Sequence, residues 1–442
     1  MSPAAASYRE ALVRLAAGSQ PGMRLGLDTT RELAESLGDP QVGLSGVLVA
    51  GTNGKGSVCV MVAEIAQRAG LRVALLTKPH LTSYRERIRL GGYPIDERRF
   101  VEVANQVADA AGVLGTGLGR PTHHEQLTLM GFLAARQWGA ELVVCEVGLG
   151  GRLDATNIWD GGVAVISSVD LDHQAQLGDT IAEIAVEKAA IIKPGNLVVA
   201  GLGPDALPAV ETAAAAAAGR LWRLGREISL LPGGEPDGDF GVATPTRARQ
   251  GLRVGLVGWY QLENAALAVA VADCLNELGF QLGEKAIQRG LAGVRWAGRM
   301  EVVGSAPPVL IDAAHNPAAV AAVLPEIGRR LDGRAGVLLF GSMSDHNHHG
   351  MLELLQRLDF RSAVFTRSSS DRAAPAAALA AEWPRAAEAI EPVPVALARA
   401  QALAGPNGLV VSLGSIYVIG EVMAALGVGL PPDPEVPYAP LW

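Results

Sequence analysis

The sequence predicts an α/β protein built around a largely parallel sheet. Short apolar runs alternate with segments of helical periodicity over almost the whole chain, which is the pattern of strands connected by helices. With 442 residues, of which 49% are hydrophobic and 19% charged, the chain is long enough for two or three domains that each bury a core. A disordered, collagen-like or disulfide-stapled chain is therefore excluded.

Two series of expected strands follow one another along the chain. A helix is expected to begin at Ser57 after the first strand, and another near Pro317 in the second series. The strands of the first series are expected at residues 47–50, 72–76, 141–147, 162–168 and 197–200. Those of the second series are expected at residues 309–312, 336–340, 363–366 and 408–413.

The segments between and after these series carry the domain boundary. Residues 203–257 are punctuated by glycine and proline, so we expect loops and an antiparallel edge there, with residues 213–218 in a helix. Gly293 and Gly298, on either side of Trp296 in LAGVRWAGRM, interrupt the pattern and predict a division into residues 1–296 and 297–442. The proline-rich tail from Pro431 is expected to be extended.

Composition restricts the class of partner. The net charge is −8, the pI is about 5.6 and the basic residues are scattered, so we expect small molecules rather than nucleic acid. No uncharged apolar run has the ~18 residues of a membrane span, and the N-terminus lacks a signal-peptide core. Three cysteines in apolar segments predict buried thiols and a cytoplasmic location.

A phosphate-binding loop follows the first strand. In VLVAGTNGKGS, glycines let the backbone N–H groups face a polyphosphate, while Lys55 adds a charge and the following helix its N-terminal dipole. Ser57 offers a hydroxyl to Mg²⁺. The pattern differs from the usual phosphate-loop motif because Gly56 follows the lysine.

A carboxylate and an imidazole follow later strands. Glu146 and His173 are expected at the carboxyl edge of the parallel sheet, where with Ser57 they form a site for Mg²⁺ or Mn²⁺. Taken alone, His173 is more typical of a structural histidine than of a metal ligand, and Glu146 is typical of either. Lys188, on an expected helix, is by its spacing alone typical of a solvated or ion-paired lysine.

Seven segments in a fixed order carry a family resemblance. They are GTNGKGS, TKPHLTSYRERIRL, EVGLGGRLDATN, DLDHQAQLG, EKAAIIKPG, IDAAHNP and GSIYVIGE. Together they resemble the folylpolyglutamate synthase/dihydrofolate synthase family of the Mur ligase superfamily, over nearly the whole chain. The resemblance implies an N-terminal ATPase domain with a phosphate loop, a smaller Rossmann-like C-terminal domain, and an active site in the cleft between them.

The resemblance also implies an activity. ATP would phosphorylate a substrate carboxylate, and the α-amino group of L-glutamate would attack the acyl phosphate to form an amide. Phosphorylation is required because a carboxylate has no good leaving group. The expected substrates are dihydropteroate, folates or both.

Carried over by motif, site residues fall into four groups. Catalytic roles are expected for Lys55, Lys188, Asp312 and His315. ATP is expected to contact Thr52, Asn53, Gly54, Lys55, Gly56, Ser57, Asn264, Arg299 and Asp312. One or two Mg²⁺ ions are expected at Ser57, Glu146 and His173, with Lys188 carbamylated and K⁺ left open as a further cation. The substrate-binding residues are expected to be Arg24, Leu25, Gly26, Thr122, His123, His124, Glu125, Leu153, Asp154, Ala155, Ser415 and Tyr417.

Some of these positions have a second interpretation or depart from the family. Thr122 and Glu125 form a T-x-x-E capping box, so a role at a helix start competes with substrate contact. His124 stands where the family has an aromatic residue. Lys78 replaces a serine associated with one Mg²⁺, and its ammonium either replaces part of the metal's charge or points away. His346 replaces a lysine in MSDHNHH, which we interpret as a polar loop rather than a metal site.

Other functions remain open at this point. Another Mur-type amino-acid ligase is one alternative, and an ATPase that drives a partner is another. Lys78 and the lysine lost at His346 favour a third, a binding protein without catalysis. The family expectation is a monomer.

Overall fold

The computed structural model describes residues 4–19, 26–114, 119–231 and 239–434. Within these residues the larger sheet has eight strands in the order β4-β3-β2-β5-β1-β6-β7-β8. Its strands are β1 (Gly46–Ala50), β2 (Val73–Leu76), β3 (Ile88–Leu90), β4 (Tyr93–Pro94), β5 (Leu142–Glu146), β6 (Gly162–Ile166), β7 (Leu197–Ala200) and β8 (Arg220–Arg223). All neighbours pair in parallel except along β2-β3-β4 at one edge. The predicted parallel α/β architecture is confirmed.

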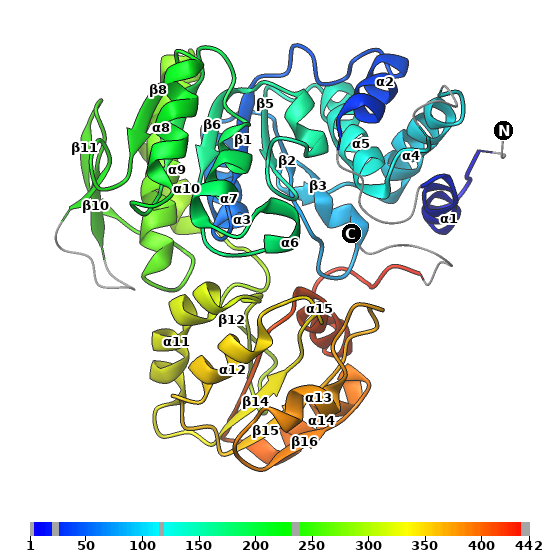
Figure 1. Cartoon of the computed structure of the whole chain (residues 1–442), viewed down its shortest axis with the longest axis vertical. Coiled ribbons are helices and arrows are strands. Elements are labelled where there is room, and N and C mark those ends of the chain that lie inside the picture. The colour runs from blue at the N-terminus through cyan, green and yellow to red at the C-terminus, as the bar shows by residue number, and fades with distance from the viewer. Residues whose placement is uncertain (1–3, 20–25, 115–118, 232–238, 435–442) are drawn as a thin grey trace.

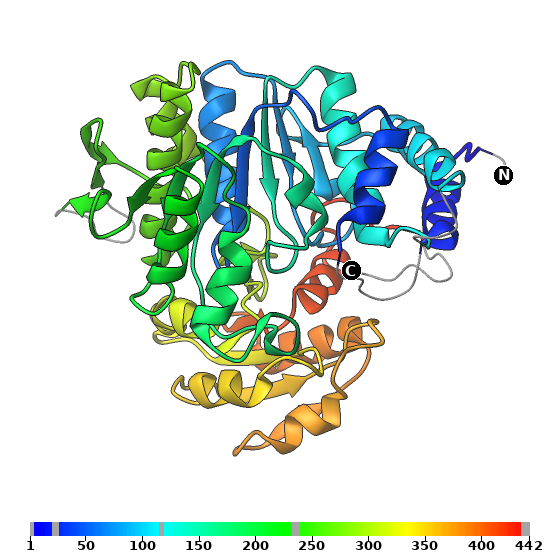
Figure 2. The same cartoon turned by 45° about the horizontal axis from the view of Figure 1, so that its top comes forward.

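Helices cover both faces of this sheet (Figures 1 and 2). One face is covered by α1 (Tyr8–Gly18), α2 (Asp28–Ser36), α4 (Glu97–Ala111), α5 (His123–Trp138), α7 (Ile181–Ala189) and α8 (Leu207–Ala216). The other face packs against α3 (Lys55–Arg68), α9 (Tyr260–Glu277) and α10 (Glu284–Gly293). Short helical turns complete this part: η1 (Tyr84–Arg87), η2 (Ala155–Ile158) and α6 (Gln174–Leu177).

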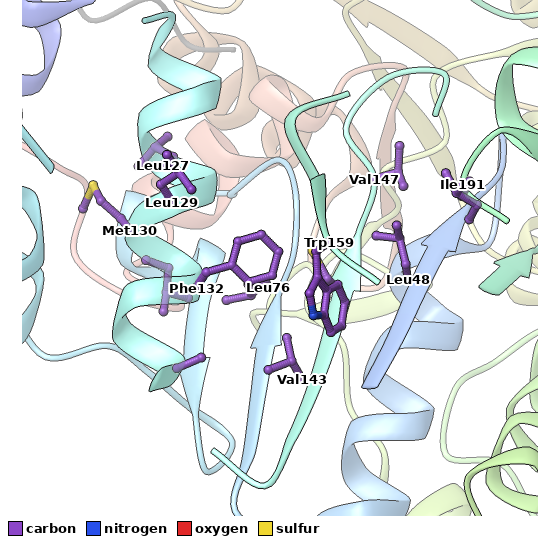
Figure 3. Packing of buried hydrophobic residues seen from close by; sticks show 14 of the residues in the cluster. Leu48, Leu76, Leu127, Leu129, Met130, Phe132, Val143, Val147, Trp159 and Ile191 are labelled. Carbon is purple, nitrogen blue, oxygen red and sulfur yellow. The ribbon is translucent and has the colours of Figure 1, made fainter. Parts of the chain in front are cut away.

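The two-residue periodicity of the strands decides which core each side chain joins. In β1, Leu48 packs in the first core whereas Val47 and Val49 pack in the second. Figure 3 shows the first core, where the ring of Phe132 on α5 lies 5.4 Å from that of Trp159. Because both faces are buried, the strands appear in the sequence as continuous apolar runs.

The segment 203–257 contains more regular structure than predicted. Besides α8, it contributes β8, which extends the larger sheet in parallel. The expected antiparallel part is a separate sheet of β9 (Ser229–Leu231), β10 (Phe240–Ala243) and β11 (Ala248–Leu252). The sequence RLWR of β8 gives a weak strand signal, because Trp222 is its one buried residue.

The C-terminal half has its own sheet, ordered β12-β13-β17-β14-β15-β16 within the described residues. Its strands are β12 (Glu301–Val303), β13 (Val309–Ile311), β14 (Gly336–Phe340), β15 (Ser362–Phe365), β16 (Ala387–Ala389) and β17 (Leu409–Leu413), parallel except for β12. The helices α11 (Pro317–Leu331), α12 (His348–Leu355) and α13 (Ala376–Ala381) cover one face, and α14 (Val393–Ala404) and α15 (Ile416–Ala425) the other.

The two halves meet through α15 and the C-terminal tail. A Cβ added at Gly420 of α15 would lie 2.0 Å from the carbonyl oxygen of Leu81, so the helix rests directly on that loop. The tail then returns to the N-terminal half, where Asp433 accepts hydrogen bonds from the Tyr8 hydroxyl at 2.7 Å and the Tyr84 N–H at 2.7 Å. The division into 1–296 and 297–442 remains a proposal; β12 begins at Glu301, and the tail crosses back.

Candidate active site

One cavity of about 840 Å³ lies where the two halves face each other. The phosphate loop and the ends of β5 and β6 line it from the N-terminal half, and the segments after β13 and β17 line it from the C-terminal half. Every predicted site residue that the structure describes lines this cavity. Arg24 and Leu25 lie outside the described residues, although Gly26 beside them lines it.

The phosphate loop has the backbone that the sequence predicts. Gly54 has φ 82° and lies at the start of α3 without any side-chain cap, so the first N–H groups of the helix are available to an anion. A Cβ at Gly54 would lie 2.5 Å from the Asn264 Oδ1 atom, which places Asn264 against the loop. Lys55 folds back, and its Nζ donates to the carbonyl oxygens of Gly51 (2.9 Å) and Thr52 (3.0 Å). The loop is thus preorganised around a cation and free N–H groups.

Lys188 is not a solvated helix lysine. Its side chain is buried, and its Nζ donates to the Gly51 carbonyl oxygen at 2.9 Å, the same oxygen that Lys55 contacts. Burial, together with the charge of Lys55, lowers the pKa of Lys188 to about 7. A large fraction of this amine is therefore neutral near neutral pH, as a nucleophilic amine must be.

The donors predicted for a divalent cation line the cavity beside the loop. A Cβ at Gly56 would lie 3.6 Å from Glu146 Oε2, so the carboxylate faces the first turn of α3, where Ser57 is buried. Burial raises the pKa of Glu146, against the nearby charge of Lys55, which lowers it. His173, with φ 50° at the start of α6, lines the same cavity. Carboxylate and hydroxyl oxygens with one imidazole suit Mg²⁺ or Mn²⁺.

No group of three or more His, Cys, Asp and Glu side chains arranged to hold a metal occurs in the described part of the chain. The predicted metal ligands Glu146 and His173, with Ser57, are too few to complete the coordination of a cation, so the cation needs further oxygen ligands. A bound polyphosphate supplies such oxygens.

The C-terminal half contributes a second group of polar residues. Asp312 is buried, which raises its pKa, and it accepts the N–H groups of Met300 (2.9 Å) and Ala314 (2.8 Å). Arg299 acts electrostatically on both Asp312 and Glu146. The Nδ1 atom of His315 lies 2.9 Å from the Ala313 carbonyl oxygen, so Nδ1–H donates to that oxygen and fixes the orientation of the ring.

Asn316 joins the two halves at the phosphate loop, and the sequence did not single it out. Its Nδ2 atom donates to Asn53 Oδ1 at 3.2 Å and to Asp172 Oδ2 at 3.1 Å. Asn316 also caps α11, because its Oδ1 accepts the N–H of Ala319. The Asn-Pro pair in IDAAHNP indicates the start of a helix. This local pattern does not show that the same asparagine also contacts the other side of the cleft.

The loop that contains His346, the residue in place of the family's lysine, faces the junction of the two halves near Asn316. The ring of His346 lies 5.3 Å from that of His315 and 6.4 Å from that of His173. Burial lowers the pKa of His346 to about 4, so the imidazole is neutral. His348 and His349 instead point to Glu382, at 2.8 Å and 3.3 Å. The three histidines therefore do not converge.

On the opposite side of the cavity, the capping box is present and its residues line the cavity as well. The Thr122 Oγ1 accepts the Glu125 N–H at 3.2 Å, and Glu125 Oε2 accepts the Thr122 N–H at 2.6 Å. The remaining Glu125 oxygen accepts the Thr30 hydroxyl at 2.9 Å. Both carboxylate oxygens are thus engaged in holding the helix start.

Lys78 points away from the metal donors. Its backbone N–H donates to Glu146 Oε2 at 3.1 Å, but its Nζ lies 3.3 Å from Thr128 Oγ1, 3.4 Å from His124 Nε2 and 3.9 Å from Asp154 Oδ1. The ammonium therefore makes its contacts on the His124 side of the cavity, while its charge still lowers the pKa of Glu146.

Asp154 organises the loop after β5. Its Oδ2 accepts the N–H groups of Gly148 and Leu149, both at 3.0 Å, and lies 3.0 Å from His124 Nε2. The charge of Lys78, followed by His124 and the hydrogen bond from Thr156, holds the pKa of Asp154 well below its usual range despite burial. Burial and the charge of Lys78 lower the pKa of His124, against Asp154, which raises it.

Arg87 is a further cavity residue that received no predicted role. Arg87 is one of three arginines in the segment TKPHLTSYRERIRL, and the sequence does not show which of the three is buried in the cavity.

Comparisons with known proteins agree with this geometry. Residues 298–416 match the family described as Mur ligase, glutamate ligase domain. The dihydrofolate synthase/folylpolyglutamate synthase of Bacillus subtilis (strain 168) is 33% identical over 361 residues, covering 79% of this chain and 83% of that protein.

Solved structures superpose over almost the whole chain. The E. coli FolC structure in complex with DHPP and ADP has a TM-score of 0.87 and 29% identity, covering 97% of this chain and 99% of that one. A bifunctional folylpolyglutamate synthase/dihydrofolate synthase solved with Mn, AMPPNP and L-glutamate has a TM-score of 0.82 and 32% identity, covering 92% and 95%. The chain thus belongs to the folylpolyglutamate synthase/dihydrofolate synthase family of ATP-dependent ligases, within the Mur ligases.

Proposed function

We propose that this chain uses ATP to join L-glutamate to the carboxyl group of dihydropteroate, of a reduced folate, or of both. The observation that carries the proposal is the single cavity that contains the phosphate loop, Glu146 and Lys188 from one half and Asp312 and His315 from the other. The relatives solved with DHPP and ADP, and with Mn, AMPPNP and L-glutamate, support the same set of ligands.

The chemistry proceeds in two balanced steps. The acceptor carboxylate attacks the γ-phosphorus of ATP, and the bond to ADP breaks, which gives an acyl phosphate and ADP. The α-amino group of glutamate then attacks the acyl carbon, and inorganic phosphate leaves as the amide forms. Negative charge accumulates on the transferring phosphoryl group, which explains why cations and free N–H groups surround it.

Several residues have assigned roles in these steps. The loop N–H groups and Lys55 hold the phosphates, while Asn264, Arg299 and Asp312 face the nucleotide. His315, whose ring is oriented by the contact of Nδ1 with the Ala313 carbonyl oxygen, lines the cavity and is the residue to which we assign the proton that the attacking amine loses. Thr52, Asn53 and Gly56 complete the loop.

We assign a divalent cation, Mg²⁺ or Mn²⁺, to Ser57, Glu146 and His173. When bound, it neutralises phosphate charge. Lys188 is the proposed site of carbamylation, in which its neutral amine adds to CO₂ and releases a proton, leaving a carboxylate in place of an ammonium. K⁺ stays an expectation without an assigned residue.

We place the acceptor on the opposite side of the cavity, against Gly26, Thr122, His123, His124, Glu125, Leu153, Asp154 and Ala155. His124 offers an imidazole face to a planar heterocycle, and Ser415 and Tyr417 serve glutamate.

In the described residues no helix is long and apolar enough to cross a membrane. A cytoplasmic location and a monomeric state stay predictions.

Phosphate release tests the proposal. Purified protein with ATP and Mg²⁺ is given dihydropteroate or tetrahydrofolate, each with and without L-glutamate. We expect sustained release only when an acceptor and glutamate are both present. Absence of glutamate-dependent release with either acceptor contradicts the ligase assignment, and release that depends on a protein partner instead supports an ATPase that drives that partner.

A further inference from the structure

Arg87 is a buried cation that lines the cavity, and among the described residues no carboxylate pairs with it. The residue is 5% exposed and lies at the end of η1. Its Nε donates to His80 Nδ1 at 2.8 Å, and its guanidinium lies over the Tyr84 ring, 5.2 Å from the centroid. Its Nη2 is buried and has no hydrogen-bond partner in the part of the chain that the structure describes. Nor does any carboxylate of the described ranges lie within ion-pair distance of it.

The two imidazoles nearest Arg87, His80 and His123, both have lowered pKa values. His80 accepts a hydrogen bond through Nδ1, and burial together with Arg87 holds its pKa well below the usual value. Burial also lowers the pKa of His123 to about 3, and its Nε2 is buried and unpartnered within the described residues. Neither imidazole supplies negative charge.

The nearest acids already serve other donors. Glu86 accepts the N–H groups of Leu81, Thr82 and Ser83, each at 3.0 Å, and so fixes the turn before η1. Asp433 accepts the Tyr8 hydroxyl and the Tyr84 N–H.

A second buried arginine, Arg249, shows which partners surround a guanidinium with a structural role in this protein. Arg249 is 7% exposed, and its Nη1 and Nη2 donate to both oxygens of Asp273 at 2.9 Å and 2.7 Å, while its Nε pairs with Glu284. A buried charge without such compensation is costly. Arg87 has the same burial and lacks the carboxylate, and it faces a cavity.

Arg87 lies in a different part of the cavity from the phosphate loop. After burial, the groups that act most on its pKa are Tyr84, Tyr417 and Asp433, whereas those that act most on the pKa of Glu146 include Lys55 and Arg299. Tyr417 is on α15, so Arg87 faces the junction of the two halves. The side chains that hold its guanidinium, His80 and Tyr84, precede β3 and do not belong to the phosphate loop, so we expect an anion held there to be other than the phosphoryl group.

We propose that Arg87 binds a substrate carboxylate other than the one that ATP activates. The planar guanidinium fork matches a carboxylate, which would pair with Nη2 and remove the uncompensated charge. This inference rests on the proposed function, which supplies two sources of such a group. One is the incoming L-glutamate, and the other is the α-carboxylate of the glutamate that a folate acceptor already carries. Dihydropteroate has no carboxylate besides the reacting one.

The test measures how strongly the enzyme distinguishes a carboxylate from its amide, with and without Arg87. Wild type and Arg87→Gln are compared with L-glutamate, L-isoglutamine and L-glutamine as amino-acid substrates, each with dihydropteroate and with tetrahydrofolate. If Arg87 holds the incoming amino acid, its loss raises KM for glutamate about tenfold or more with both acceptors. The preference for glutamate over one of the two amides then shrinks by a similar factor.

The second source predicts another pattern. If Arg87 holds the acceptor's glutamate, KM for tetrahydrofolate rises while KM for dihydropteroate stays unchanged. Unchanged KM values for all substrates, or equal losses for glutamate and both amides, overturn the proposal, because a structural role lowers all activities together.

Controls separate folding from binding. Arg249→Gln removes an equally buried guanidinium far from any assigned role, and we expect it to lower Tm while leaving the KM ratios unchanged. If Arg87→Gln does not fold, as judged by circular dichroism and ADP binding, the same series is run with Arg87→Lys, which keeps the charge and loses the fork. Wild-type protein without glutamate-dependent turnover contradicts the proposed function. Normal wild-type turnover with full discrimination retained in the variants contradicts only the assignment of Arg87.

Discussion

At the scale of single residues, two lysines show how surroundings decide chemistry. Lys55 and Lys188 both donate to the carbonyl oxygen of Gly51, yet only Lys188 is deeply buried. Burial, and then the charge of Lys55, lower the pKa of Lys188. A third lysine, Lys78, is turned toward His124 and Thr128.

The pKa of Lys188 predicts how its carbamylation depends on pH. Because that pKa is lowered from 10.5 to about 7, the reactive neutral amine is scarce at pH 6 and predominant at pH 8. We expect a carbamate signal in carbon-13 NMR with labelled bicarbonate that increases from pH 6 to pH 8 and is absent in Lys188→Ala. Turnover of this variant should fall about 10- to 100-fold. Wild-type turnover in Lys188→Ala would contradict the assignment.

Lys78→Met tests which side of the cavity the ammonium serves. The variant keeps the backbone N–H that Glu146 accepts, so the Mg²⁺ concentration for half-maximal turnover should stay unchanged. Because Lys78 lowers the pKa of His124, removal of its charge should raise that pKa, although burial continues to depress it. NMR titration of the imidazole and KM for the acceptor measure the effect. A large shift in Mg²⁺ dependence would place Lys78 at the metal instead.

At the scale of elements, the loop between β1 and α3 can bind an anion because no side chain caps the start of α3. A side chain at the N-cap position normally satisfies the first N–H groups of a helix, but Gly54 has none to offer. Ser168 Oγ accepts the N–H of Asn53 at 2.9 Å and so braces the turn from β6. The free N–H groups of α3 are consequently left for a ligand.

Gly54→Ala should damage nucleotide binding more than stability. The residue has φ 82°, which costs an alanine about 1–2 kcal/mol, and its Cβ would lie 2.5 Å from Asn264 Oδ1. We expect ADP affinity to fall about tenfold or more by calorimetry. Gly70→Ala is a matched control, since Gly70 has φ 93° with open space around it, and it should lower Tm without changing ADP affinity. Equal ADP affinity in both variants would contradict the role of this loop.

At the scale of the whole molecule, function depends on how the two halves meet. The contacts of α15 with Leu81, of Asp433 with Tyr8, and of Asn316 with Asn53 surround the cavity from different directions. A displaced C-terminal half would carry Asp312 and His315 away from the phosphate loop.

Gly420→Ala should therefore lower turnover by separating the halves. Its Cβ would lie 2.0 Å from the Leu81 carbonyl oxygen, so α15 must move away. We expect kcat to fall about tenfold or more, since misplacement of reacting groups by ~1 Å costs about 100-fold. Gly328→Ala on α11, whose Cβ would touch only Leu358 at 3.4 Å, should leave turnover unchanged and hold or raise Tm. Similar kcat values for both variants would show that this contact does not position the site.

Local features could be predicted from the sequence, and contacts between distant segments could not. The strand at Val47 and the capping box at Thr122 follow from residues a few positions apart, and both are present. The burial of Lys188 depends on β1 and α7 packing together, which spacing within one helix does not report. Asn316 looked like a helix cap and is one, but its contact with Asn53 spans 263 positions.

By itself, the sequence determined the α/β architecture, the two series of strands that follow one another along the chain, the phosphate loop and, through seven ordered segments, the family. These depend on periodicity and on backbone conformations that neighbouring residues impose. Only the tertiary structure decided that the Lys78 ammonium lies toward His124 and that Arg87 is buried with no carboxylate partner among the described residues. Burial and charge compensation are set by whichever distant groups the fold brings together, and an isolated stretch of residues contains no record of them.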